Sequence, residues 1–351
     1  MENIWWNQVT NAVRFVNDIK QSLLDEKSIL ISYSHTMPWR DYFVDTIKDA
    51  VKLVNAEKKF VDIPIVQDIG KYLLNEFCKK EKRTEYRPSK GYAKFFAEND
   101  DLVFHDRYFW CQVNDEKNLN QWGEFASDYI KGRDKKDYKA VFVLEWSGKA
   151  CPPIKKGIKV FDFDDYIGEY DRIVFAVLAS SCVKEDTFIK GYLSELVSNI
   201  SGNDIELASE CINRHKAFLD DPLSFIRKTC LEKRHSDGSE FEFEKDENMI
   251  QHLIWLSQIK KVYPHLEEYR EDFVSKHSEA ILKHLPIQAS YGEYYTDPKD
   301  VELGTLVYMV GSGELFLNSG EYNSLKNHKE ARNKLSHLSI LDIKEIRELL
   351  K

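Results

Sequence analysis

Short apolar runs alternate with stretches of helical spacing along the first half of the chain. The clearest run is 138–145, where five consecutive apolar residues precede Glu145. Runs of this length predict buried strands, whereas apolar residues at i, i+4 and i+7 predict amphipathic helices. On this basis we expect strands at 28–33, 60–65, 101–113, 138–145 and 159–164, and helices at 3–24, 41–55, 66–78 and 118–131.

The alternation of strands and helices is typical of a mostly parallel, doubly wound α/β sheet. Residues 171–178 fit either a strand or a helix, because a short apolar run satisfies both patterns. After residue 185 the strand pattern fades and helical spacing continues. We therefore predict an α/β domain over residues 1–185 and an all-α domain over residues 186–351.

The second half contains an acidic loop at 236–248, and Pro286 and Pro298 mark breaks between elements. Residues 186–235 fit two or three helices. Further helices are expected near 249–264, 265–284, 301–317, 321–337 and 341–351.

Charge and cysteine usage narrow the class of partner. The chain has 50 Lys and Arg residues against 59 Asp and Glu residues, a net charge of −9. This balance argues against a general DNA binder or a polybasic membrane binder and leaves a local RNA site open. The first residues lack the features of a signal peptide, and no stretch approaches the roughly 18 apolar residues of a membrane span. Six dispersed cysteines without a CxxC pair predict reduced thiols in the cytoplasm.

The layout of the first half resembles that of a P-loop NTPase. A phosphate-binding P-loop needs glycines for a tight turn, a lysine for the phosphates and a hydroxyl for magnesium. Residues 34–41, which follow the first predicted strand, contain neither glycine nor lysine. The resemblance therefore implies a degenerate NTPase-like domain, and we predict no bound cofactor.

Three polar positions near strand ends are candidates for chemistry. Glu145 ends the clearest strand, where a catalytic or metal-holding carboxylate would lie; the alternative is a solvated acidic residue. Arg40 and His35 lie in the loop after the first strand, and such loops bind ligands in α/β sheets. Alternatively, Pro38 and Trp39 pack a turn and Arg40 is solvated.

A group of carboxylates follows the last predicted strand, at Asp162, Asp164 and Asp165. Three carboxylates so close in sequence bind a metal ion only where further ligands converge on them. The sequence contains neither a matching nuclease pattern (Lys149 stands at the wrong distance from Glu145) nor an HExxH motif. We therefore predict no metal site.

The most specific local pattern lies near the C-terminus. Arg332 and His337 are separated by four residues on the predicted helix 321–337, and the polar Asn333 directly follows the arginine. This arrangement resembles the R-x4–6-H motif of the HEPN superfamily. The resemblance implies metal-independent RNA cleavage at the cleft of a dimer.

In such a site His337 would exchange protons with the ribose 2′-hydroxyl and the leaving 5′-oxygen, because its ordinary pKa lies near cellular pH. Arg332 would hold the phosphate, and Asn333 would support the pair. Arg332 and His337 lie about 140° apart around a straight helix, so a kink or a partner subunit would have to bring them together. Alternatively, Arg332 pairs with a neighbouring carboxylate and His337 caps the helix.

Two functions follow from these patterns. The combined resemblances imply a cytoplasmic bacterial defence or stress-response protein with a HEPN-type endoribonuclease site that acts on RNA. The alternative is a non-enzymatic scaffold or adaptor that binds a protein partner or a second copy of the chain. The seven tryptophans suit either a core or such an interface.

Overall fold

The computed structural model describes residues 1–351 except 134–135, 137, 149–155, 244, 289–291 and 293. The chain divides into two compact units. The first unit comprises Met1–Phe175 and His235–Ser239, and the second comprises Ala176–Arg234 and Glu240–Lys351. The division falls inside one helix, α9 (Glu169–Ser181). The sequence-based division at residue 185 stays a prediction.

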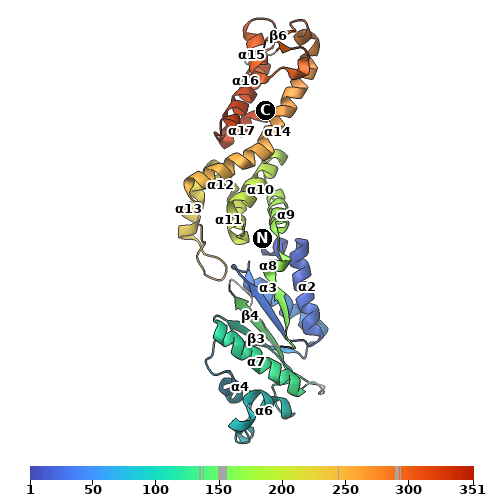
Figure 1. The fold of residues 1–351 in the computed structure, drawn as a ribbon, viewed down its shortest axis with the longest axis vertical. Helices are drawn as coiled ribbons and strands as arrows, with labels where there is room; N and C mark the ends of the chain where they lie inside the picture. Colours follow the sequence, from blue (N-terminus) through green and yellow to red (C-terminus); the bar gives the residue numbers. More distant parts are fainter. Residues whose placement is uncertain (134–135, 137, 149–155, 244, 289–291, 293) are drawn as a thin grey trace. The chain divides into compact units, whose positions relative to one another are not determined.

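A five-stranded parallel sheet forms the centre of the first unit (Figure 1). Its strands pair in the order β2-β3-β4-β1-β5, so β1 and β4 lie side by side although they are far apart in sequence. Because all pairs are parallel, the carboxyl ends of the strands meet at one edge. The strands are β1 (Ile29–Tyr33), β2 (Lys59–Ile63), β3 (Arg107–Val113), β4 (Val141–Ser147) and β5 (Lys159–Asp162).

Helices cover both faces of this sheet. On one face Phe109 and Leu144 belong to an apolar core that includes Leu73, Phe96 and Trp122. That core draws on α4 (Ile69–Phe77), α6 (Tyr92–Glu98) and α7 (Glu116–Arg133). The other face meets α2 (Thr10–Leu24) and α3 (Arg40–Val54), with α1 (Glu2–Gln8) and α8 (Phe163–Tyr166) beside them. Short turns α5 (Lys80–Arg83) and η1 (Pro88–Lys90) complete the unit.

The regular structure that is described in the second unit is helical apart from a two-residue antiparallel pair and an isolated antiparallel bridge between Arg234 and Glu240. Its core toward the C-terminus includes Phe273, Ile281, Leu306 and Leu325. The predicted fold class, an α/β first half with a parallel, doubly wound sheet and a helical second half, is confirmed. Its elements are α10 (Thr187–Ser201), α11 (Ile205–Asn213), α12 (His215–Asp220), α13 (Pro222–Glu232), α14 (Glu247–Leu282), β6 (Ile287–Gln288), β7 (Tyr294–Tyr295), η2 (Pro298–Asp300), α15 (Leu303–Gly311), α16 (Ser319–Ser336) and α17 (Ile343–Leu349).

Several predicted boundaries were wrong. The two helices expected at 249–264 and 265–284 are one helix of 36 residues, α14, which continues through Pro264. The proline removes one backbone hydrogen bond, but Val262 and Leu266 on either side are fully buried, so packing holds the helix together. Conversely, the helix expected at 3–24 is two helices, because Val9 is extended at φ −82° and ψ 115°.

Other local differences concern the type and number of elements. The ambiguous segment 171–178 is helical and lies within α9, and residues 186–235 form four helices instead of two or three. Trp5, Trp6, Trp110 and Trp122 are buried, so these four belong to the core. The five described cysteines are unpaired, and Cys151 lies outside the described residues. Within the described chain no helix has the length and apolar character needed to span a membrane.

Candidate functional site

Glu145 lies near the carboxyl end of β4, on the sheet face that meets α3. Side chains alternate along a strand, and Leu144 and Trp146 point into the opposite core. In the sheet register Glu145 stands beside Gln112 of β3 and Ile31 of β1. The carboxylate is therefore held at the point where two strands distant in sequence come together.

Both oxygens of Glu145 are fully engaged by donors from three elements. Arg40 makes a bidentate pair, with Nε 2.6 Å from Oε1 and Nη2 2.7 Å from Oε2. The hydroxyl of Tyr33 donates to Oε1 at 3.0 Å, and the indole Nε1 of Trp110 donates to Oε2 at 2.8 Å. The side chain is only 1% exposed. The interpretation of Glu145 as a solvated strand-end residue was therefore wrong.

Arg40 is the first residue of α3, and the loop before it sets its position. Trp39 adopts the left-handed conformation, φ 45° and ψ 54°, which is uncommon for a bulky residue. The guanidinium is 18% exposed, and in the orientation that satisfies both groups the Gln112 amide oxygen accepts from Nη2 at 2.7 Å. The interpretation of Arg40 as a solvated residue was wrong, and His35 is exposed in the same loop.

Tyr33 completes the network as a proton donor. Burial and the nearby charge of Glu145 raise the pKa of its hydroxyl, so the O–H stays intact across the physiological range. The carboxylate thus accepts from two neutral donors and one cation. Removing one partner from a buried pair of this kind leaves an uncompensated charge, so the pair is expected to keep its geometry.

Two of the three carboxylates at the end of β5 and just after it accept hydrogen bonds that hold the neighbouring backbone in place. Asp162 accepts from the backbone N–H of Asp164 at the start of α8 and from the hydroxyl of Ser32 at 3.3 Å. Asp164 accepts from the backbone N–H of Ser34 at 2.8 Å. Among the described residues no group of three or more His, Cys, Asp or Glu side chains is arranged to hold a metal ion, and Lys149 lies outside them.

A polar pocket of about 390 Å³ lies beside Arg40. It is lined by α3 and by the ends of β2 and β3. Within it Lys48 pairs with Asp62, with Nζ 2.7 Å and 2.9 Å from the two carboxylate oxygens. Arg40 and Asp41 on the same wall also pair with each other, with Nη1 of the arginine 3.0 Å from Oδ1 of the aspartate.

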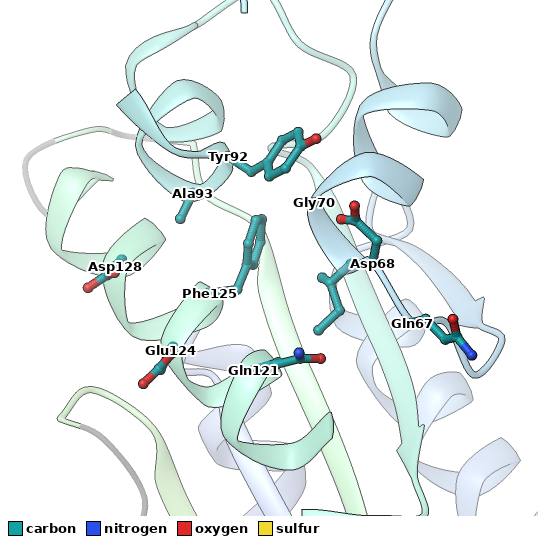
Figure 2. A pocket seen from close by; sticks show the side chains of 10 residues that line it. Gln67, Asp68, Gly70, Tyr92, Ala93, Gln121, Glu124, Phe125 and Asp128 are labelled. Carbon is teal, nitrogen blue, oxygen red and sulfur yellow. The ribbon is translucent and has the colours of Figure 1, made fainter. Parts of the chain in front are cut away.

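A second pocket, of about 430 Å³, lies on the opposite face of the sheet between α4, α6 and α7 (Figure 2). Its wall depends on Gly70, since a Cβ there would lie 2.0 Å from the ring of Tyr92. Tyr92 also stacks on Tyr86, with ring centroids 4.3 Å apart. Asp68, which is exposed, and Phe125, which is buried, also line this pocket. Neither pocket was foreseen from the sequence.

The predicted catalytic residues lie at the end of α16. Arg332 is 30% exposed, and its Nη2 lies 3.5 Å from Oε1 of Glu302. Asn333 is half-buried, and His337 is exposed at the C-cap of the helix. The helix continues to Ser336, so the angular separation of Arg332 and His337 is retained.

Another histidine, His328, lies within α16 and was not singled out by the sequence analysis. His328 is buried, its Nδ1 lies 2.8 Å from the carbonyl of Ser324, and its ring stacks on Tyr269 at a centroid distance of 3.5 Å. Burial lowers the pKa of His328 to about 4, so the ring is neutral near pH 7. The sequence does contain a signal for this burial, because His328 occupies one of the apolar positions of the helix.

No protein-family model matches the chain, and no curated protein sequence is similar to it. Among solved structures, the crystal structure of Saccharomyces cerevisiae RIF2 is similar at 8% sequence identity and a TM-score of 0.31. That similarity covers 64% of this chain and 88% of the other. A similarity this weak carries no argument about fold or function.

Proposed function

We propose that this chain is a non-enzymatic scaffold or adaptor of a cytoplasmic bacterial defence or signalling complex, built on an inactive NTPase-like domain. The observation that carries the proposal is the buried Glu145–Arg40 pair at the ligand-binding edge of the sheet. In an open α/β sheet this edge is where ligands bind. Here its central carboxylate accepts four hydrogen bonds from Arg40, Tyr33 and Trp110.

Catalysis or metal binding at Glu145 would require at least one free carboxylate oxygen. Releasing one means breaking the bidentate pair and leaving Arg40 without its partner. Breaking a buried pair is costly, about 3–5 kcal/mol. This energy favours a structural role for the pair, and with it a domain that binds partners instead of turning over nucleotides.

Partner binding by the second unit is testable through its exposed aromatic side chains. Phe316 is 87% exposed and Tyr308 is 64% exposed. We expect tagged protein to co-purify with a specific cellular protein, and the double variant F316S/Y308S to lose that protein without a change in Tm. Exposed polar residues replaced in K326S/E330S provide the control. A chain that stays partnerless but hydrolyses ATP with magnesium would contradict the proposal.

A second candidate function is metal-independent cleavage of RNA by a homodimer, with Arg332, Asn333 and His337 in the roles described above. The accessibility of His337 and the partial exposure of Arg332 favour it. The test incubates purified protein with labelled RNA and EDTA. Cleavage that H337A abolishes and H284A retains would support this function, since His284 is a comparably exposed histidine. Equal cleavage by H337A and the wild type would refute it.

The pairing of Arg332 with Glu302 suggests a further pair of variants for the same RNA-cleavage assay. If Arg332 acts on the phosphate, its carboxylate partner competes with substrate. E302Q should then increase RNA cleavage. The control E330Q neutralises a carboxylate of α16 that pairs with Lys326, and it should leave cleavage unchanged. A loss of cleavage in E302Q would mean that the ion pair positions Arg332 instead of restraining it.

A further inference from the structure

The segment that joins α4 to α6 is strongly basic in an acidic chain. Residues 79–94 carry seven Lys and Arg side chains against two Glu side chains, a net charge of +5, whereas the whole chain has a net charge of −9. This basic segment contains α5, η1 and the start of α6, all within the first unit. Clustered positive charge is the electrostatic footprint of a site for a polyanion.

Backbone hydrogen bonds fold the basic segment into consecutive tight turns. The N–H of Arg83 donates to the carbonyl of Lys79 at 3.1 Å, and the N–H of Tyr86 donates to the carbonyl of Arg83 at 3.2 Å. The next turn is closed by the N–H of Lys90, which donates to the carbonyl of Arg87 at 3.0 Å. The side chain of Arg83 also donates to two backbone carbonyls at the C-terminal end of α4. The cations are therefore held close together on a compact support.

Four of the seven cations keep their charge available for a ligand. Three form ion pairs with carboxylates of the first unit, namely Lys82, Lys90 and Lys94. Within the part of the chain that the structure describes, the other four make no ion pair, and these are Lys79, Lys80, Arg83 and Arg87. All of these four except Arg83 are exposed. The guanidinium of Arg87 donates to neutral backbone carbonyls, which leave its charge uncompensated. Exposed cations of this kind bind phosphate groups with release of counterions.

An aromatic stack lies next to Arg87 in the same segment. Tyr86 stacks on Tyr92 with ring centroids 4.3 Å apart and an angle of 7° between the ring planes. Tyr86 also meets the buried ring of Phe95 in a T-shaped contact, which fixes the stack to the core of the unit. Both tyrosines are half-buried, so part of the stack remains accessible. Aromatic rings beside cations hold nucleobases that are not paired, which favours a single strand over a duplex.

We propose that the basic segment binds single-stranded nucleic acid, with Lys79, Lys80 and Arg87 on the phosphates and Tyr86 against a base. It contains none of the residues assigned to the two candidate functions above, so this proposal is independent of whether the chain is an adaptor or a nuclease. The acidic remainder of the chain repels the same ligand, and binding is thereby confined to this segment.

Fluorescence anisotropy with labelled oligouridine RNA and the full chain tests the role of the cations. We expect K80E/R87E to bind at least about tenfold more weakly than the wild type. Its slope of log affinity against log salt should be smaller by about 1.4, because each phosphate contact of a single strand contributes about 0.7. The matched control K52E/K117E makes the same change in net charge at exposed lysines of α3 and α7, and it should bind like the wild type. If K80E/R87E fails to fold, K79E/K80E takes its place.

The choice of ligand tests the role of the tyrosine stack. Duplex RNA should bind more weakly than oligouridine, and an oligothymidine arm shows whether the 2′-hydroxyl adds affinity. Y86L with an unchanged Tm should lose about tenfold in affinity for oligouridine and keep its affinity for heparin, a polyanion without bases. Equal RNA affinities of folded K80E/R87E and K52E/K117E, or an unchanged affinity in Y86L, would overturn the proposal. Tighter binding of polyglutamate than of oligouridine would also overturn it and assign the surface to an acidic protein segment.

Discussion

Replacing Arg40 with methionine isolates the energetic role of the buried pair. The side chain of Glu145 is 1% exposed in the wild type, and in R40M its carboxylate would keep only the two neutral donors Tyr33 and Trp110. Removing one partner of a buried ion pair costs about 3–5 kcal/mol, because the remaining charge is left uncompensated. Urea unfolding followed by tryptophan fluorescence measures this loss, since six of the seven tryptophans lie in the first unit.

The double variant R40M/E145Q tests whether charge is the cause. A neutral amide at position 145 can still accept from the indole N–H of Trp110 through its oxygen and donate through its NH2 to the hydroxyl of Tyr33. The double variant should therefore be at least about 2 kcal/mol more stable than R40M. K48M is the control, because it breaks another ion pair of α3 whose carboxylate, Asp62, is 71% exposed, and it should cost less than about 1 kcal/mol. A loss below 1 kcal/mol in R40M, or no recovery in the double variant, would refute the reasoning.

Three further predictions concern His328, Gly70 and Asp342. The pKa of His328 is about 4 in the folded state and about 6.5 in the unfolded state. Between these two pH values the unfolded state binds more protons, so the free energy of unfolding falls as the pH drops from 6.5 to 4. Urea unfolding at a series of pH values should show that H328F loses this pH dependence. G70A should cost about 1–3 kcal/mol because the new Cβ meets the ring of Tyr92, and Y92L should relieve part of that loss in thermal unfolding. D342A should cost about 1 kcal/mol in the same assay, since it removes the capping box of α17; an unchanged Tm would contradict this.

The class of the fold could be predicted because periodicity is a local property. The strand around 141–147 is apolar at consecutive positions, and both its existence and its burial follow from that pattern. Helix ends were less predictable, since Pro264 and Val9 behave according to the packing of their neighbours. The residues next to Pro264 are buried by distant segments, and no local rule contains that information.

The candidate site was predictable only in part for a related reason. Glu145 stood out at the end of a buried strand, but its partner Arg40 is 105 residues away in sequence. Only the strand order, with β1 inserted between β4 and β5, brings the two together. The roles of Arg332, Asn333 and His337 stay predictions, because their chemistry depends on a partner or a substrate.

The return of His235–Ser239 to the first unit has a consequence for dissecting the protein. The polypeptide passes from one unit to the other three times, after Phe175, before His235 and after Ser239. A single proteolytic cut after Phe175 would therefore leave His235–Ser239 on the fragment that carries the second unit, and a cut at either later junction would leave Ala176–Arg234 on the fragment that carries the first. A fragment that stops at residue 185 would omit His235–Ser239, five residues of its own unit. To prepare the first unit alone, this segment has to be added as a separate peptide or joined to the fragment.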